Sequence, residues 1–362
     1  MNTRVASFAG KRVYIGLDVH RTFFVASSIC EGELVKRCRM PASSEAVISF
    51  ISKYFPESEV ETCYEAGFSG FWLHRELEAS GISNLMVHAA AIEVAANNRV
   101  KTDKRDSLKM ATQLSAGTLY GIRVPTLQEE YRRLLFRTRE QLMGAKRRAQ
   151  IQIRMRLHQF GLFPAEIKRV ITLKDVKKIL EDLEGELKFA IELLYDQWVQ
   201  LVEKIKQLEQ RLKDQAKLDP LEEIYRSVPG IGLLTARALS SELGDMSQFR
   251  NIRGLYSFTG LTPGEYSSGE KVHRGRISRQ GSPRLRHLLV EAAWKAIRKD
   301  DSLRKSFENI AGRAGKKRAI VAIARKLIGR IRATLRDSKL YEVKYEHKKA
   351  AELSTRIDET EK

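Results

Sequence analysis

The amino-acid sequence predicts an α/β domain at the N-terminus and a mainly helical remainder. Short apolar, β-branched runs alternate with helical spacing in the N-terminal part. Residues 127–215 are rich in Leu, Lys, Arg, Glu and Gln and hold almost no Gly, which is typical of long helices. With 362 residues, of which 43% are hydrophobic, the chain is long enough for two domains and a linking element.

The N-terminal elements follow a definite order. Three strands come first, over residues 12–18, 22–29 and 33–39, with a turn at Glu31-Gly32 between the last two. A helix, a strand, a helix, a strand and a helix follow, over residues 43–54, 59–64, 71–79 and 84–88 and from about residue 89. A three-strand meander followed by alternating helices and strands is the order of the ribonuclease H-like fold.

The middle region is predicted to hold two long helices. A basic helix covers residues 127–159 and ends at a break over residues 161–164. Farther along, apolar residues recur at steps of three and four, at Leu187, Ile191, Leu194, Trp198, Leu201, Ile205, Leu208 and Leu212. This heptad seam is expected either in a dimerising coiled coil or in an antiparallel helix pair within one chain.

A third region begins near Pro220. It holds a Pro-Gly turn at residues 227–232, a helical stretch over 233–243, a Gly-rich basic segment, and helices near 283–299 and 316–337. The expected organisation is therefore a catalytic α/β domain, a helical coiled-coil region, a C-terminal domain and a charged tail, over residues 1–125, 126–218, 219–345 and 346–362.

The charge of the chain is large and uneven. The formal net charge is +20, but residues 1–120 hold 14 Lys and Arg against 13 Asp and Glu, which leaves +19 for residues 121–362. Clustered cations favour an anionic polymer as partner, because binding to phosphates releases counterions. We expect a nucleic acid; a merely basic protein, such as a ribosome-associated factor, is the alternative.

The three cysteines, Cys30, Cys38 and Cys63, form no CxxC pair. An odd number suits a reducing cytoplasm better than a disulfide framework, and no zinc site is expected without paired ligands. The sequence has no apolar run of membrane-spanning length, and its first residues lack the apolar core of a signal peptide. The protein is predicted to be cytoplasmic.

Four carboxylates stand at informative places. Asp18 ends the first predicted strand and Glu65 follows the fourth, while Asp103 and Asp106 share one face if their segment is helical. In a ribonuclease H-like fold these positions meet, and such a cluster needs a cation such as Mg²⁺ or Mn²⁺. Two such ions would act at a phosphorus, and nearby Lys101, Lys104 and Arg105 suit phosphates. Each acid alone could equally be a helix or turn cap.

The Gly-rich segment carries serines among cations. Residues 264–286 hold six basic side chains against two Glu, namely Lys271, Arg274, Arg276, Arg279, Arg284 and Arg286. Ser267 and Ser268 precede a glycine, and nearby positive charge would favour a serine alkoxide as nucleophile. On the residues alone, a phosphate-binding loop whose serines only donate hydrogen bonds is the preferred interpretation.

The Pro-Gly turn has two interpretations. Its sequence, SVPGIG followed by LLTA, is similar to the hairpin of helix-hairpin-helix modules, in which backbone amides at a turn hold a DNA phosphate. Gly230 and Gly232 would supply that backbone. A plain connector between two helices fits equally well.

Together these motifs resemble a known family. GLDVH, YEAG, KTDKRD, VPGIG and GLTPGEYSSGEKVHRGRISRQGSPRLR are similar to the motifs of the DEDD transposases of the IS110 type, also called Piv-like recombinases, and most of all to the IS1111 subgroup. The resemblance covers about residues 12–300. It implies a RuvC-like N-terminal domain, a coiled-coil linker and a C-terminal transposase domain.

The resemblance also implies a mechanism. Asp18, Glu65, Asp103 and Asp106 match the DEDD tetrad, and Ser268 matches the proposed nucleophile, with Ser267 as the alternative by one residue. The metal site of one subunit and the serine of another would form a composite centre in a dimer or tetramer. The serine would hold a DNA strand covalently, and an element-encoded bridge RNA would select target and donor DNA.

Two other functions remain open. A RuvC-like nuclease that cuts Holliday junctions with water would need the carboxylates but not Ser268. An architectural nucleic-acid-binding protein would need neither. The tetrad is an argument against the architectural protein, and the serine motif, under the resemblance, is an argument against the water-using nuclease.

Overall fold

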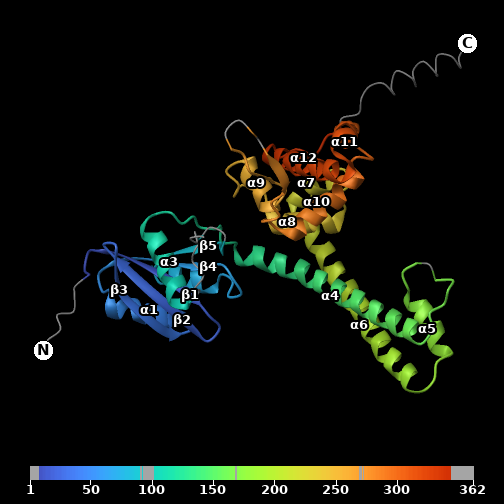
Figure 1. Cartoon of the computed structure of the whole chain (residues 1–362), viewed down its shortest axis with the longest axis horizontal. Helices are drawn as coiled ribbons and strands as arrows, with labels where there is room; N and C mark the ends of the chain where they lie inside the picture. Colours follow the sequence, from blue (N-terminus) through green and yellow to red (C-terminus); the bar gives the residue numbers. More distant parts are fainter. Residues whose placement is uncertain are drawn as a thin grey trace, which may run out of the picture. The chain divides into compact units, whose positions relative to one another are not determined.

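The structure is a computed structural model that describes residues 8–89, 92, 102–167, 169–268, 271 and 273–343. Lys101 and the predicted charged tail at 346–362 lie outside these residues. The chain divides into two compact units, Met1–Pro125 and Thr126–Lys362 (Figure 1). Within the described ranges, no helix combines the length and the apolar composition that a membrane crossing requires.

The N-terminal unit is built on one mixed sheet. Its strands are β1 (Arg12–Val19), β2 (Phe23–Cys30), β3 (Glu33–Pro41), β4 (Glu59–Glu65) and β5 (Ser83–Val87), in the order β3-β2-β1-β4-β5. The first three form an antiparallel meander, whereas β4 pairs parallel to β1 and β5 parallel to β4. All five predicted strands are confirmed within two residues, and their order fits the ribonuclease H-like arrangement.

Helices cover both faces of this sheet. On one face, α1 (Ser44–Tyr54) and α2 (Trp72–Ala79) cover an aliphatic and aromatic core that includes Ile15, Leu17 and Phe50. On the other face lies α3 (Asp103–Ser115), which continues the chain after residues 93–101, where the helix predicted from about residue 89 lies outside the described residues.

Small residues let α3 approach the sheet closely. A Cβ atom at Gly16 of β1 would overlap the backbone oxygen of Ser107 and the backbone nitrogen of Ala111, both in α3. Beside it, the hydroxyls of Ser27 and Ser107 lie 2.8 Å apart in a buried hydrogen bond. The thiol of Cys63 donates to the Met110 carbonyl at 3.6 Å, and burial raises the pKa of this thiol to about 12. Because these side chains are small, the backbone of α3 lies close to the backbone of β1.

The second unit begins with a pair of long helices. The predicted basic helix is confirmed as α4 (Leu127–Gln159), which begins at a capping box of Thr126 and Glu129. After α5 (Leu173–Glu181), α6 (Gly185–Ala216) runs back beside α4 (Figure 1). Phe136 near the start of α4 clusters with Leu212 near the end of α6, so the two helices are antiparallel.

The predicted heptad seam faces its own chain. Ile191, Trp198, Leu201, Ile205 and Leu212 are buried. Two of them, Ile191 and Trp198, form a cluster with residues of α4 and α5, among them Ile153 and Val176. Of the two interpretations of the seam, the structure shows the antiparallel pair within one chain.

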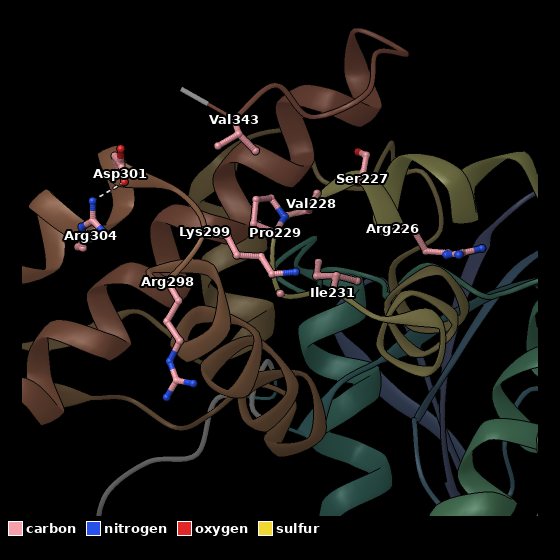
Figure 2. A pocket seen from close by; sticks show the side chains of 11 residues that line it. Arg226, Ser227, Val228, Pro229, Ile231, Arg298, Lys299, Asp301, Arg304 and Val343 are labelled. Carbon is pink, nitrogen blue, oxygen red and sulfur yellow. Dashed lines mark hydrogen bonds and ion pairs between the residues drawn. The ribbon is translucent and has the colours of Figure 1, made fainter. Parts of the chain in front are cut away.

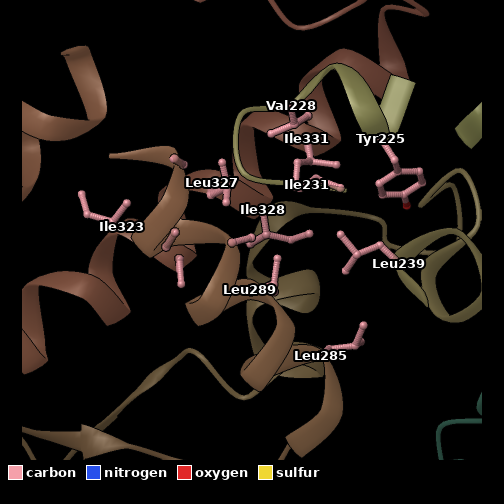
Figure 3. Packing of buried hydrophobic residues seen from close by; sticks show 14 of the residues in the cluster. Tyr225, Val228, Ile231, Leu239, Leu285, Leu289, Ile323, Leu327, Ile328 and Ile331 are labelled. Carbon is pink, nitrogen blue, oxygen red and sulfur yellow. The ribbon is translucent and has the colours of Figure 1, made fainter. Parts of the chain in front are cut away.

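The rest of the unit is a helical bundle around one apolar core. It contains α7 (Pro220–Ser227), α8 (Leu233–Leu243), α9 (Ile252–Thr259), α10 (Pro283–Ala296), α11 (Asp301–Ala314) and α12 (Lys316–Arg336). Figure 3 shows aliphatic side chains from α8, α10 and α12 packed together, among them Leu239, Leu289 and Ile328, with Tyr225 of α7 at the edge of the group. The sequence predicted α8, α10 and α12 but not α9 or α11.

Ion pairs connect the bundle to the helix pair. The buried Arg237 of α8 donates to Asp219 at 3.3 Å, to Glu222 at 3.0 Å and to Gln215 of α6 at 3.1 Å. Arg137 of α4 donates both guanidinium arms to Glu242 of α8, each at 2.9 Å. The two long helices are therefore attached to the bundle by charge-assisted hydrogen bonds.

Candidate active site

Two acidic residues lie at the carboxyl ends of neighbouring parallel strands. Leu17 of β1 is in register with Tyr64 of β4, so Asp18 and Glu65 occupy the next positions of adjacent strands. Adjacent strands lie about 4.8 Å apart. Because side chains alternate along a strand, Asp18 shares the face of Gly16, and Glu65 shares the face of Cys63. Both carboxylates therefore belong to the sheet face that α3 covers.

The first turn of α3 brings two further carboxylates. Thr102 caps the helix by accepting a hydrogen bond from the Arg105 amide at 3.4 Å, and Asp103 and Asp106 follow in the first turn. Because Gly16 lets α3 lie close to β1, this helix start is held beside the end of the strand. The segment that contains the paired aspartates is helical, as the sequence analysis required.

His20 also belongs to this group, although the sequence did not predict it. His20 Nε2 lies 3.3 Å from Asp18 Oδ2 and 3.4 Å from Asp103 Oδ2. This nitrogen is buried and has no partner in hydrogen-bond geometry. One ligand atom from each of Asp18, His20 and Asp103 lies within 4.8 Å of the others. The signal was present in GLDVH, because residues two apart at a strand end point to one face.

The electrostatics of Asp18 reflect the crowding of carboxylates. Its pKa is raised, chiefly by burial; Asp103 and Asp106 raise it further, and His20 opposes the shift. A divalent cation would offset this repulsion, and the carboxylates of Asp18 and Asp103 are oxygen donors of the kind that Mg²⁺ and Mn²⁺ prefer. The His20 nitrogen beside them is a donor that softer divalent ions favour. The residues present therefore fit a metal ion.

The four predicted acids are not equivalent in the structure. Asp106 is close enough to raise the pKa of Asp18, but its Oδ1 lies 3.3 Å from Lys109 Nζ. Glu65 is exposed and lies outside the three-atom cluster, although its strand position is next to that of Asp18. Of the cations predicted nearby, Lys104 and Arg105 are exposed in the first turn of α3.

In the second unit, the Gly-rich basic segment is a β-hairpin rather than the predicted loop. Its strands are β6 (Pro263–Glu265) and β7 (Arg274–Ile277). Nearer the tip, Ser268 and Lys271 exchange backbone hydrogen bonds of 3.2 Å. Gly269, Glu270 and Val272 lie outside the described residues. The hairpin fixes the backbone of Ser268 at an exposed position.

The two serines differ in their hydrogen bonds. The Ser267 hydroxyl donates to Glu265 Oε1 at 2.8 Å, within the hairpin. Among the described residues, the Ser268 hydroxyl makes no hydrogen bond to a carboxylate, and Ser268 is exposed. Of the two hydroxyls, that of Ser268 is therefore the better placed to meet a phosphate.

The six basic residues of this segment fall into two groups. Lys271, Arg276 and Arg279 are exposed on or beside the hairpin, and the Arg274 backbone belongs to β7 while its side chain lies outside the described atoms. Arg284, in contrast, is paired with Glu140 and, at 3.3 Å, with Glu242. These ion pairs hold α10 against α4 and α8, and the phosphate contact of Arg284 stays a prediction.

Arg286 is also engaged within the chain. Its guanidinium donates to the Thr259 carbonyl at 3.4 Å and lies where a Cβ atom at Gly260 would be. Gly260 ends α9 in the left-handed conformation, with φ 66°. Arg286 therefore covers the end of α9, beside the start of the hairpin.

The Pro-Gly turn joins α7 to α8, as the helix-hairpin-helix interpretation requires. Gly230 has φ +86°, and a Cβ atom there would overlap the Ala292 carbonyl oxygen, so the turn packs directly on α10. Gly232 is the N-cap of α8 and has no side chain that could accept a hydrogen bond. The first backbone amides of the helix therefore have no intrahelical acceptor.

A cleft opens beside this turn. Figure 2 shows Lys299 lying along Pro229 and Ile231, whereas Arg226 and Arg298 point away from the turn. Arg304 pairs with Asp301 at the other side of the cleft. The arrangement of helix, turn and helix is confirmed, and one cation reaches toward the turn.

Two family models match the chain. The model DEDD_Tnp_IS110, described as "Transposase", matches residues 15–162. The model Transposase_20, described as "Transposase IS116/IS110/IS902 family", matches residues 222–308. The first match contains all four predicted carboxylates and His20, and the second contains the Pro-Gly turn and the serine hairpin.

Relatives match over most of the chain. The y4qE protein of Sinorhizobium fredii, named as a candidate transposase, is 29% identical over 78% of this chain and 72% of its own. The "Transposase for insertion sequence element IS1533" of Leptospira borgpetersenii is 27% identical, covering 79% and 85%. The "Transposase for insertion sequence element IS1111A" of Coxiella burnetii is 26% identical, covering 86% of each chain.

Proposed function

Because the chain belongs to the DEDD transposases of the IS110 family, we propose that it cuts and rejoins DNA strands to move an insertion sequence. The observation that carries this proposal is the convergence of Asp18, His20 and Asp103 at the end of β1 under the start of α3. We infer that this cluster, with Asp106 and Glu65, is the catalytic centre of a RuvC-like domain. The protein would act in the bacterial cytoplasm, on the nucleoid.

The acidic centre would hold Mg²⁺ or Mn²⁺. Asp18 and Asp103 would be the inner ligands, since their oxygens already converge on His20 Nε2. Asp106 and Glu65 would complete the site after small side-chain movements, for which Glu65 is free because it is exposed. The bound ion would supply Lewis-acid stabilisation of charge on the oxygens around a DNA phosphorus.

Ser268 would be the nucleophile. Its oxygen would form a bond to a DNA phosphorus, and the bond from that phosphorus to one strand oxygen would break. The proton of the serine would end on the departing strand as a hydroxyl, and the broken strand would stay attached to the protein until another strand hydroxyl attacks. Exposure at the tip of a hairpin and the neighbouring Lys271 support this role.

The partners would be target and donor DNA duplexes and an element-encoded bridge RNA. Lys271, Arg276 and Arg279 on the hairpin, and the amides at Gly230 and Gly232 with Lys299 beside them, would hold phosphates. A dimer or tetramer would let the serine of one subunit serve the carboxylates of another. The division of the second unit into a helical linker and a transposase domain is part of this proposal.

A covalent trapping assay tests the function. Wild type, Ser268→Ala, Ser267→Ala and Asp18→Ala are each mixed with Mg²⁺, labelled target and donor DNA and the adjacent non-coding RNA. We expect a denaturation-resistant protein–DNA adduct that is lost in Ser268→Ala and Asp18→Ala and kept in Ser267→Ala. Loss in Ser267→Ala alone would move the nucleophile by one residue. Cleavage without an adduct in all serine variants would favour the water-using junction nuclease.

A further inference from the structure

We propose that Arg37, Arg39 and Lys104 line a phosphate-binding groove that guides the DNA strand to the carboxylates. The groove has a volume of about 910 Å³ and is lined by residues of β2, β3 and the start of α3, namely Phe23, Val25, Arg37, Cys38, Arg39, Thr102, Asp103 and Lys104. It shares Asp103 with the candidate metal centre. The proposal rests on the proposed function, because the groove would bind the DNA strand on which the metal centre acts.

The register of the sheet places the two arginines in line with the centre. Asp18 is opposite Val25, and Val25 is opposite Arg39. Gly16, Ser27 and Arg37 form the next such row. With strands about 4.8 Å apart, Arg39 lies roughly 10 Å from Asp18 across the same face of the sheet. A strand that crosses β3 and β2 would therefore arrive at the carboxylates.

A chain of ring contacts connects Arg39 to the centre. The Arg39 guanidinium lies 3.9 Å from the centroid of the Phe23 ring, and the Phe23 and His20 ring centroids are 4.6 Å apart. His20 in turn reaches Asp18 and Asp103. Stacking on Phe23 fixes the plane of the guanidinium and leaves its edge N–H groups to donate to a ligand.

The cations of the groove have no carboxylate partner in the described ranges. Arg37 donates only to the Ser27 hydroxyl, at 3.4 Å, Arg39 stacks on Phe23, and neither they nor Lys104 form an ion pair there. Residues 1–120 carry almost no net charge, so this group is a local excess. Unpaired cations gathered beside an acidic centre suit an anion that must bridge both, as a DNA strand does.

Position on an edge strand offers a simpler explanation. β3 is the edge of the sheet, and edge strands often carry cations that prevent pairing with other chains. That explanation applies equally to Lys36, which directly precedes Arg37 on β3 but belongs to the other face of the sheet, with its Nζ 4.1 Å from the centroid of the Tyr54 ring. Lys53 lies beside the same ring. These two lysines provide a matched control of equal charge.

The experiment compares Arg37→Ala/Arg39→Ala with Lys36→Ala/Lys53→Ala in the full chain. The affinity for a labelled donor DNA duplex with a single-stranded end is measured in Ca²⁺ over a range of salt concentrations. Each phosphate contact on single-stranded DNA contributes about 0.7 to the slope of log affinity against log salt. We expect the arginine variant to lose about 1.4 from the slope and roughly 10-fold in affinity, and the lysine variant to match wild type.

Adduct formation in Mg²⁺ gives a second measurement. We expect the arginine variant to need roughly 10-fold more DNA for half-maximal rate, with the rate at saturating DNA kept within about twofold. Equal salt slopes in the two double variants would overturn the groove, even with a fully active enzyme. If wild type forms neither adduct nor cut, the proposed function fails, and the salt slopes still decide whether the groove binds DNA.

Discussion

Two clusters of charged side chains in this molecule are built in opposite ways. In the second unit, Arg237 is 1% exposed and meets Asp219 and Glu222, so the chain supplies both signs. In the first unit, Asp18 meets Asp103 and Asp106, and His20 Nε2 lies 3.3 and 3.4 Å from Asp18 and Asp103. The Arg237 cluster, here called the closed cluster, balances its charges with its own residues, although Arg237 Nε and Glu222 Oε2 stay without hydrogen bonds. The Asp18 cluster, here called the open cluster, keeps an excess of carboxylates.

The closed cluster is expected to stabilise the fold, and the open cluster is expected to bind a ligand. A buried cation with two carboxylates fixes the register of the elements that carry it and needs nothing from outside. Carboxylates held together by a closely packed helix keep a repulsion that folding does not relieve, and a site of this kind is completed by a ligand. Substitutions at the two clusters should therefore affect different properties of the protein.

The largest expected effect is on activity at the open cluster. Asp18→Asn should lower the rate of adduct formation by at least about 10³-fold, because a ligand of the metal is lost. The thermal stability of the metal-free protein should stay equal or rise by up to about 1 kcal/mol, since repulsion with Asp103 is removed. Adduct kinetics and thermal unfolding in EDTA measure the two effects. A strong loss of stability in Asp18→Asn would instead mean that Asp18 stabilises the fold.

At the closed cluster the expected effect is on stability. Arg237→Met should destabilise the second unit by about 3–5 kcal/mol, because Glu222 loses its buried guanidinium partner and Asp219 is left with Arg132 at 3.5 Å. Urea unfolding of the full chain measures the change. The triple variant that also carries Asp219→Asn and Glu222→Gln removes the uncompensated charges and should recover much of the loss. Equal stability of the single and triple variants would show that packing, and not charge, explains the cluster.

A metal should stabilise the open cluster only. Mg²⁺ or Mn²⁺ at 100 times its dissociation constant should raise the stability of the first unit by about 2.7 kcal/mol. The unfolding temperature of wild type should rise with the ion and fall back with EDTA, whereas Asp18→Asn/Asp103→Asn should not respond. The same rise in the double variant would mean that the ion binds elsewhere.

The smallest effect concerns the packing that holds the open cluster together. Gly16→Ala should cost about 1–3 kcal/mol, because the new methyl group meets the backbone of α3. It should also weaken metal binding, since Asp103 moves away from Asp18. Gly144→Ala in α4 is the control; its Cβ would meet only the end of Arg148, so a gain of about 0.5–1 kcal/mol is expected. A neutral Gly16→Ala would contradict the close packing.

The N-terminal fold could be predicted because local patterns decide it. The strands of the sheet carry buried, β-branched runs. The bounds of α4 agree with the prediction, which ended the helix at the break over residues 161–164. The β6–β7 hairpin was missed because its strands are short and glycine-containing, with the sequences PGE and RGRI, and lack an apolar alternation. α9 was missed because it is short and lies next to that segment.

The candidate site was predictable in composition but not in detail. Strand ends and a helix start predicted that Asp18 and Asp103 lie together. The spacing of GLDVH was enough to place His20 on the face of Asp18, but the approach of its Nε2 to both carboxylates depends on tertiary packing. Arg284 shows the same limit, because a basic motif does not reveal that Glu140 and Glu242 lie beside it. The partner of a charged side chain is decided by tertiary packing.

The antiparallel α4–α6 pair also sets the distance from the α5 end to the helical bundle. Each helix is unbroken, 33 and 32 residues long, so the pair extends roughly 50 Å at 1.5 Å per residue. Its length can change only in certain steps. Seven residues added to both helices would lengthen it by about 10 Å while the apolar seam turns by only about 20°. An increment of two or five residues would instead turn the seam by roughly 140–160° and take Trp198 and its neighbours out of it. The distance from the α5 end to the bundle can therefore change only by increments that keep the seam facing its partner helices.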